Sequence, residues 1–390
     1  MNIEPASRLA TLLAEPGATA LLAALEEAGE GARIVGGAVR NALMNIEFSD
    51  IDITTTALPQ KVMRIAQGKG WKAVPTGIEH GTITVVIDGQ PYEVTTLRED
   101  IATDGRRAHV RFGHDFRADA ARRDFTINAM SVGLNGVLHD EFGGLADLAA
   151  RRVRFIGDPD QRLAEDYLRG LRFLRFSAIY AEGPLDAPGL AAIMRHHEGF
   201  AQLSRERIRA EMFKLVMAPR ALDIMREAED WGLVSAIVRL KPDLQRLERL
   251  LARPGGGESE AILRIFSLFD SSEVEALRSS LKLSNRERML CQALKDALAM
   301  QETGVEPRLI SYRHPEAAAH LPLLTETPIA PLPSPPVFLI KGEDIVKAGV
   351  RPGPEIGRLL HQVEDRWIGA GFPEGRIAQI ALMKAALAEV

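Results

Sequence analysis

The pattern of hydrophobic and polar positions changes character along the chain. From about Ser7 to Ala28, alanine and leucine recur with the spacing of one helix. Through residues 32–155, short β-branched runs alternate with turns, as expected for the strands of a small sheet. From about Gln161 to about Thr303 the pattern is helical, and strand signals nearly vanish. These patterns predict an α+β fold, in which a mixed head precedes a series of helices.

Turn residues mark the strands of the head. Ala32–Val35 is an apolar run that ends at Gly36-Gly37. Thr82–Ile87 alternates and is followed by Asp88-Gly89, a dipeptide typical of two-residue hairpin turns. The return strand is therefore predicted from Tyr92 to Thr96.

A proline-rich segment interrupts the helical pattern late in the chain. Residues 325–336 (TETPIAPLPSPP) predict an extended linker or loop, and residues 337–390 return to a helical pattern. We expect four parts in order: a head over residues 1–155, a helical neck over 156–220, a helical body over 221–324, and a linker and helical tail over 325–390.

Two aspartates one residue apart are the first candidates for chemistry. On a strand, residues i and i+2 point to the same face, so Asp50 and Asp52 would project together while Ile51 enters the core. Two carboxylates held that close raise each other's pKa, and a divalent cation such as Mg²⁺ removes the penalty. If the strand that contains Glu93 pairs beside this one, three carboxylates can hold two metal ions. The alternative is that Asp-x-Asp is a solvated strand edge or turn.

The segment before these aspartates favours a phosphate site. Gly36 and Gly37 would let the backbone approach a triphosphate, and the following helix, Val39–Met44, would present free N–H groups at its start. Arg40 adds a guanidinium fork for phosphate oxygens. Together with the aspartates, this turn predicts metal-dependent nucleotidyl transfer, in which one metal activates a hydroxyl and the other stabilises pyrophosphate.

Composition restricts the partners. The chain has 390 residues, of which 46% are hydrophobic and 26% charged, as in ordinary globular proteins of two or more domains. Its formal net charge of -5 means that a nucleic acid would have to be held by a local basic surface. The one cysteine, Cys291, excludes a disulfide framework or a cysteine-based zinc site within the chain. We expect a cytoplasmic protein with no signal peptide, no membrane contact and no obligate protein partner.

Four motifs follow one another along the chain. They are Gly36–Arg40 with Asp50-Ile51-Asp52, Arg122–Ala129, Glu165–Phe176, and Ser204–Ile208 with Glu211. In this order they resemble the class II CCA-adding enzymes and bacterial poly(A) polymerases of the polymerase-β-like nucleotidyltransferase superfamily. One departure is Asn41, where the family usually has Asp, but this change removes no metal ligand. The resemblance implies a small mixed β-sheet head followed by an all-α neck, body and tail.

The resemblance also implies roles for the second motif. Arg123 and Asp124 would contact the sugar and phosphates of the bound nucleotide, and Asn128 would assist them. Asp124 could accept a hydrogen bond from a ribose 2′-OH, which would favour ribonucleotides. The segment Asp104–Arg107 resembles the family's mobile loop, which couples nucleotide choice to catalysis.

The third motif would select the base. On a helix predicted from Gln161 to about Tyr180, Asp166 and Arg169 are three residues apart and share a face. By the resemblance, they would read the Watson–Crick edge of an incoming C or A, while Arg172 and Arg175 would reach phosphates or hold the pair in place. The alternative is an ordinary salt-bridged helix surface.

The activity implied by the resemblance is template-independent addition of C, C and A to the 3′ end of tRNA from CTP and ATP, with Mg²⁺ as cofactor. A poly(A) polymerase or a partial enzyme that adds only CC or only A is the alternative within the family. The net charge of -5 and the lack of a basic tail favour the tRNA enzyme. A small-molecule nucleotidyltransferase is disfavoured by the helical C-terminal portion, and a non-catalytic RNA binder by the intact Asp50, Asp52 and Glu93.

Overall fold

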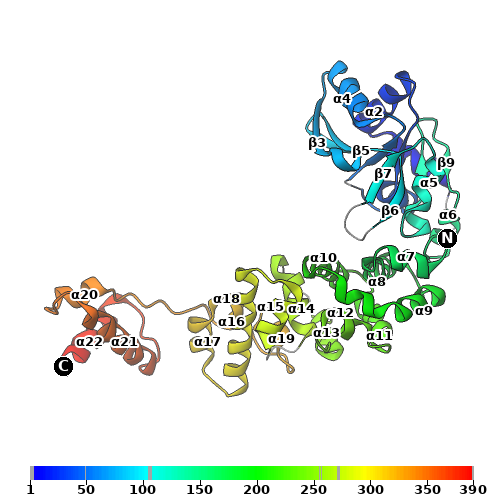
Figure 1. The fold of residues 1–390 in the computed structure, drawn as a ribbon. Coiled ribbons are helices and arrows are strands. Elements are labelled where there is room, and N and C mark those ends of the chain that lie inside the picture. The colour runs from blue at the N-terminus through cyan, green and yellow to red at the C-terminus, as the bar shows by residue number, and fades with distance from the viewer. Residues whose placement is uncertain are drawn as a thin grey trace. The chain divides into compact units, whose positions relative to one another are not determined.

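The computed structural model describes residues 4–48, 50–103, 108–253, 255, 257–269 and 273–388. They form two compact units, residues 1–241 and residues 242–390 (Figure 1). The first unit contains every strand that the structure describes, together with helices α1 to α12, and the second unit is helical. The α+β fold class is therefore confirmed, whereas the finer division into four parts stays a prediction.

A mixed seven-stranded sheet lies at the centre of the first unit, in the order β3-β4-β5-β2-β1-β8-β9. β2 and β5 run parallel, and the other neighbouring strands run antiparallel. A separate two-stranded sheet pairs β6 with β7. The strands are β1 (Ala32–Val35), β2 (Asp52–Thr55), β3 (Lys72–Gly77), β4 (Thr82–Ile87), β5 (Gln90–Thr96), β6 (Arg98–Thr103), β7 (Ala108–Phe112), β8 (Ser131–Val132) and β9 (Leu138–His139).

The predicted hairpin is confirmed and sets the position of β5. Asp88 and Gly89 both have positive φ, 50° and 84°, as a tight hairpin turn between right-twisted strands requires. The turn returns the chain antiparallel to β4, and β5 then pairs on its other side with β2. On β5, Val94 is fully buried while Glu93 is exposed, so successive side chains alternate between the core and the surface.

The single N-terminal helix predicted from Ser7 to Ala28 is wrong. The structure has two helices, α1 (Pro5–Leu13) and α2 (Pro16–Glu27), which meet at 91°. Pro16 suits only the first turn of a helix, and the Glu15 carboxylate accepts a hydrogen bond from the Ala18 N–H at 2.9 Å, so α2 begins anew there. Of the helices described, none is by itself long and apolar enough to cross a membrane, and this bent pair meets that criterion only jointly.

Helices α3 (Gly37–Met44) and α4 (Pro59–Gly68) pack beside the sheet, and a further set of helices completes the first unit (Figure 1). α8 contacts α7, α10 and α11, and its leucines, Leu168, Leu171 and Leu174, are buried. The helices in this set are α5 (Phe116–Ala121), α6 (Gly144–Ala149), α7 (Pro159–Glu165), α8 (Leu168–Tyr180), α9 (Ala187–Arg195), α10 (Arg205–Val216), α11 (Ala221–Glu229) and α12 (Leu233–Val238).

The continuous helix predicted from Gln161 to Tyr180 is also wrong, because α7 ends at Glu165 and α8 begins at Leu168. Asp166 has an extended backbone, with φ -159° and ψ 105°. Its side chain accepts a hydrogen bond from the Leu168 N–H at 3.1 Å. Aspartate competes in this way with the backbone for N–H groups, which favours a helix start over a helix interior.

The second unit consists of helices and a proline-rich connection. Residues 326–341 contain neither helix nor strand, as the proline content predicts. Phe338, in residues 326–341, makes a ring contact with the buried Trp367, which also contacts Tyr312 and Phe372. The proline-rich connection is therefore packed against the neighbouring helices. The helices are α13 (Leu244–Leu251), α14 (Glu260–Leu268), α15 (Val274–Leu281), α16 (Asn285–Glu302), α17 (Pro307–Arg313), α18 (Pro315–Ala318), α19 (Leu321–Leu324), α20 (Gly342–Lys347), α21 (Pro354–Gly369) and α22 (Arg376–Leu387).

Candidate active site

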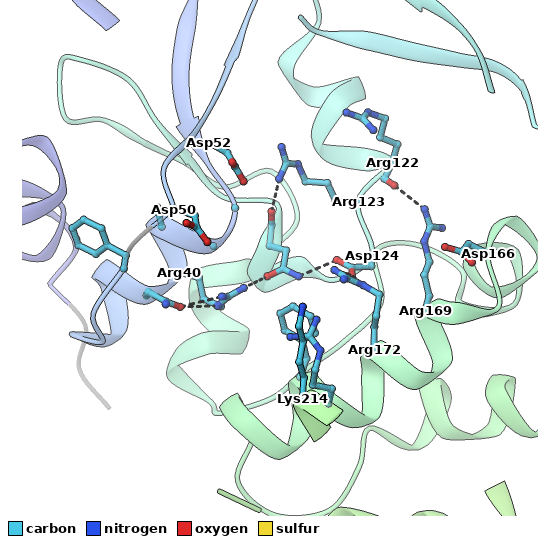
Figure 2. Close-up of a pocket in the computed structure, with 18 of the residues that line it drawn as sticks. Arg40, Asp50, Asp52, Arg122, Arg123, Asp124, Asp166, Arg169, Arg172 and Lys214 are labelled. Atoms are coloured by element: carbon cyan, nitrogen blue, oxygen red, sulfur yellow. Dashed lines mark hydrogen bonds and ion pairs between the residues drawn. The ribbon is translucent and has the colours of Figure 1, made fainter. Parts of the chain in front are cut away.

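An open cleft of about 690 Å³ in the first unit brings together nearly all the predicted site residues. Figure 2 shows Asp50 and Asp52 on one side, Asp166 and Arg169 on the other, and Asp124 and Arg172 between them. Glu93 lies outside the lining. The predicted residues that line the cleft are Gly36, Gly37, Arg40, Asp50, Asp52, Arg123, Asp124, Asn128, Asp166, Arg169, Arg172 and Arg175; the others are Ala38, Asn41, Glu47, Phe48, Arg122, Phe176 and Lys214.

The glycine turn between β1 and α3 opens into this cleft. Gly36 has φ 70° and ψ -121°, a conformation that strongly favours glycine. A Cβ at Gly36 would lie 2.9 Å from Nη1 of Arg123, so a side chain there would also displace that arginine. α3 starts at Gly37, and the first N–H groups of a helix have no partner within the helix. Backbone donors and a positive helix end therefore face the cleft, as a phosphate site requires.

Asp50 and Asp52 both line the cleft as predicted, but only Asp52 lies on the strand, because β2 begins there. Ile51 is buried, with 5% of its surface exposed, whereas Asp50 and Asp52 are exposed to the cleft. Asp52 is the register partner of Glu93 across the parallel β2–β5 pair. Partial burial raises the pKa of Asp52 above its ordinary value, Glu93 and Asp50 raise it further, and Arg123 opposes them.

These carboxylates suit a hard divalent cation that keeps part of its hydration shell when it is bound. Among the described residues, no three Asp, Glu, His or Cys side chains are grouped closely enough to hold a metal ion. Glu93 therefore influences Asp52 by charge, and the structure does not group it with the two aspartates as a third ligand. Two carboxylates with like-charge repulsion nevertheless fit Mg²⁺, which is bound in proteins through one or two carboxylates, water and substrate phosphates.

A buried polar chain joins α3, the segment after α5, and α8. Arg40 donates through Nη1 to Oδ1 of Asn128, and Nδ2 of Asn128 donates to Oδ1 of Asp124 at 2.9 Å. The second carboxylate oxygen of Asp124 accepts from Nε and Nη2 of Arg172 at 2.7 and 2.6 Å. Arg40, Asp124 and Asn128 are each 7% exposed. The second motif is thus fixed between two arginines from distant parts of the sequence.

Glu211 on α10 extends this chain. Its Oε2 accepts from Nε of Arg175 at 2.5 Å, and its Oε1 lies 3.8 Å from Nη1 of Arg172. Both guanidinium groups also lie over the ring of Phe176, at 4.3 Å for Arg175 and 5.2 Å for Arg172. These contacts fix the orientation of both arginines along the cleft.

Asp166 and Arg169 both line the cleft, but they do not pair with each other in the structure. Asp166 accepts from Nη2 of Arg207 at 2.7 Å. Arg169 donates to the Glu165 carboxylate and, at 3.0 Å, to the carbonyl of Arg122. Separate partners therefore hold the two side chains, and one accepts while the other only donates.

Arg123 is supported from the α5 side. Its Nη1 donates to the Asn128 carbonyl at 3.3 Å, and its Nη2 lies 3.4 Å from Asp119. Asp119 is 2% exposed and also pairs with Arg122. The buried Asp119 carboxylate thus pairs with both arginines of the second motif. Arg123 is directed toward Asp52 (Figure 2).

Lys214 and Tyr180 are among the contributors that sequence reasoning missed. Lys214 lines the cleft from α10, and its helical spacing of three from Glu211 could have indicated this. Tyr180 stacks on Arg40 with its ring 4.2 Å from the guanidinium carbon and accepts a hydrogen bond from Arg40 Nη2 at 2.7 Å. No local pattern indicated that contact, because the two residues are distant in the sequence. The predicted loop over Asp104–Arg107 lies outside the described residues.

Comparison with known proteins agrees with this fold and cleft. Residues 32–154 match the family model described as the Poly A polymerase head domain. The mitochondrial CCA tRNA nucleotidyltransferase 1 of Mus musculus is 34% identical over 365 residues, which cover 87% of this chain and 83% of that protein. The CCA-adding enzyme of Levilactobacillus brevis is 31% identical over 389 residues, covering 93% and 95%.

Solved structures agree in fold. The crystal structure of the Bacillus stearothermophilus CCA-adding enzyme in complex with CTP has a TM-score of 0.74 at 26% identity, covering 95% of this chain and 97% of that one. The Thermotoga maritima CCA-adding enzyme complexed with tRNA-CCA has a TM-score of 0.70 at 19% identity, a likeness of fold, over 99% and 100%. The fold, the cleft and these relatives define a nucleotidyltransferase. Within that class, the chain belongs to the family of CCA-adding enzymes, the tRNA nucleotidyltransferases.

Proposed function

We propose that this nucleotidyltransferase adds C, C and A to the 3′ end of tRNA from CTP and ATP, without a nucleic-acid template, and releases pyrophosphate. The observation that carries the proposal is the cleft itself, which Asp50, Asp52 and the start of α3 line on one side and Asp166 and Arg169 line on the other (Figure 2). The names of the relatives support the tRNA substrate and favour this activity over poly(A) synthesis.

Asp50 and Asp52 are the proposed metal ligands and, with Glu93, the proposed catalytic carboxylates. Mg²⁺ at this pair would supply Lewis-acid activation of the 3′ hydroxyl and stabilise the charge on the leaving pyrophosphate. The raised pKa of Asp52 supports the assignment, since the repulsion that causes it would be relieved by a cation. Glu93 adds negative charge beside Asp52 and so strengthens the attraction for a cation.

The triphosphate would lie at the start of α3. Gly36 and Gly37 would offer backbone N–H groups, and Arg123 would offer a guanidinium close to Asp52. Asp124 and Asn128 would face the ribose, because their segment lies between the phosphate wall and the base wall of the cleft. The Asp124 oxygens now accept from Arg172, Asn128 and the Phe125 N–H, so a ribose 2′-OH would replace one of these donors, and that exchange would favour ribonucleotides.

Asp166 and Arg169 would replace a template strand. The carboxylate can accept from the exocyclic amino group of C or A, and the guanidinium can donate to the ring nitrogen and, for C, to the carbonyl oxygen. U and G present the opposite pattern, so an acceptor of the base would face the Asp166 carboxylate and a donor of the base would face the Arg169 guanidinium. Arg172 and Arg175 would hold this wall through Asp124 and Glu211, and the helical residues 221–390 would hold the tRNA. The cytoplasmic location stays a prediction.

The test is incorporation of each labelled nucleoside triphosphate, with Mg²⁺, into a tRNA transcript that lacks its 3′ CCA. Addition of two C residues from CTP alone, followed by one A when ATP is added, is the expected result. Long runs of A on any RNA would instead assign a poly(A) polymerase. Addition that stops after CC, or that requires an existing CC end, would assign a partial enzyme.

A further inference from the structure

Arg40 carries a buried charge whose hydrogen-bond partners are all neutral. Its guanidinium donates to Oδ1 of Asn41 through Nε at 3.2 Å and Nη2 at 3.0 Å, to Tyr180 at 2.7 Å, and to Asn128. Its side chain stacks on the Tyr180 ring. Burial lowers the pKa of Arg40, which reflects the cost of keeping this charge away from water.

The other arginines of the cleft differ from Arg40 in this respect. Each has a carboxylate within ion-pair distance: Asp119 for Arg122 and Arg123, Glu165 for Arg169, Asp124 for Arg172, and Glu211 for Arg175. Among the residues that the structure describes, Arg40 forms no ion pair. Asp124 attracts it at longer range, but the oxygens of that carboxylate are bonded to Arg172, Asn128 and the Phe125 N–H. A buried guanidinium without a counter-ion is an incomplete arrangement that an anion in the cleft would complete.

Asn41 is the residue that leaves Arg40 without a counter-ion. Its Oδ1 accepts from Arg40 and from the Tyr180 hydroxyl at 3.2 Å, as a carboxylate would, but it carries no charge. Its Nδ2 donates to the Glu47 carbonyl at 3.1 Å, which a carboxylate cannot do. Glu47 belongs to the segment that leads to Asp50. An amide at this position therefore holds Arg40 and the approach to the metal-binding strand together without neutralising the guanidinium.

We propose that Asn41 is a positioning residue that keeps the positive charge of Arg40 available to the phosphates of the incoming nucleotide. The bound triphosphate supplies the counter-charge that Arg40 lacks, so nucleotide binding and completion of this buried site are linked. The inference rests on the proposed function only in naming a nucleotide as the source of the phosphates. Its chemistry requires an anionic phosphate group and no particular base.

The test compares Asn41→Asp with Asn135→Asp, which adds the same charge at an exposed turn outside the cleft. Binding of CTP, ATP and inorganic tripolyphosphate, each with Mg²⁺ and without RNA, is measured by titration calorimetry on the full chain. Since one added charge beside Arg40 offsets its attraction for phosphate, we expect Asn41→Asp to weaken all three ligands by a similar factor, roughly tenfold. We also expect it to raise the melting temperature of the free protein. Asn135→Asp should change neither quantity.

Asn41→Ala separates charge from structure. It removes the amide contacts but leaves Arg40 uncompensated, so it should lower the melting temperature and weaken the ligands less than Asn41→Asp does. Equal losses in the two variants, or unchanged binding in Asn41→Asp, would overturn the proposal. If wild-type protein binds tripolyphosphate more tightly than Asn41→Asp does but adds no nucleotide to tRNA, the proposed function is refuted and this inference stands.

Discussion

Asn128 offers a quantitative test of the buried chain that organises the cleft. It is 7% exposed and links two charged groups, accepting from Arg40 and donating to Asp124 at 2.9 Å. A hydrogen bond to a charged group contributes about 1.5–3 kcal/mol, so two of them give about 3–6 kcal/mol. In Asn128→Ala, water from the open cleft can form hydrogen bonds with some of the Arg40 and Asp124 atoms that lose their partner. We therefore expect a loss near the lower end, about 3 kcal/mol, in the free energy of unfolding of the first unit.

The assay is calorimetric unfolding of the full-length variant beside wild type. For a unit of this size, about 3 kcal/mol corresponds to a fall of roughly 6–12 °C in the melting temperature. The control is Asn135→Ala, which removes one exposed hydrogen bond to the Val137 N–H and should cost less than about 1 kcal/mol. If Asn128→Ala lost no more stability than the control, the chain from Arg40 to Arg172 would not be the structural link described above.

Three further predictions concern the carboxylates and the glycine turn. Because burial and neighbouring carboxylates raise the pKa of Asp52, its ionised form destabilises the fold at neutral pH, and this cost disappears as the pH falls below the ordinary value of 3.8. Asp52→Asn should thus have a higher melting temperature than wild type at pH 7 and the same melting temperature near pH 3. A difference in melting temperature that is equal at both pH values would show that ionisation of Asp52 is not its cause. Gly36→Ala should lower stability by about 1–3 kcal/mol in thermal unfolding, because of its positive φ, and weaken CTP binding, because its Cβ would press on Arg123; unaltered binding would contradict the phosphate assignment. Asp166→Ala should reduce discrimination between CTP and UTP by at least ~100-fold in incorporation assays, with a smaller effect on folding; retained fidelity would refute the base-reading role.

The parts of the fold that depend on short-range chemistry were predictable. The strand Ala32–Val35 and the turn at Asp88-Gly89 are where their local residues indicate. The break before Pro16 carried a local signal too, because proline suits the first turn of a helix, but the continuous run of alanine and leucine outweighed it. The break at Asp166 carried a weaker local signal, because aspartate favours a helix start but also occurs on exposed helix surfaces. Its side chain is held partly by Arg207, which lies far along the sequence on another helix.

The candidate site shows the same difference between features set by local sequence and features set by distant contacts. Motifs identified its residue types, and the cleft gathers all of them except Glu93, which reaches Asp52 only across the strand pair. Their partners were not predictable from spacing. Arg40, expected as a free fork for phosphate, is held by Tyr180 and Asn128. The Tyr180 contact depends on where α8 packs and the Asn128 contact on the segment after α5, and no short window of sequence contains both partners of either contact.

The most direct measurement of the central claim uses wild type and Asp52→Asn side by side. Each is given a tRNA transcript without its 3′ CCA, with CTP, ATP and Mg²⁺, and both the extension products and the tRNA affinity are measured. The account predicts ordered addition of C, C and A by wild type and loss of addition in Asp52→Asn, with tRNA binding unchanged. Full extension by Asp52→Asn would contradict it, because the carboxylate pair at the start of β2 could not then be the catalytic metal site.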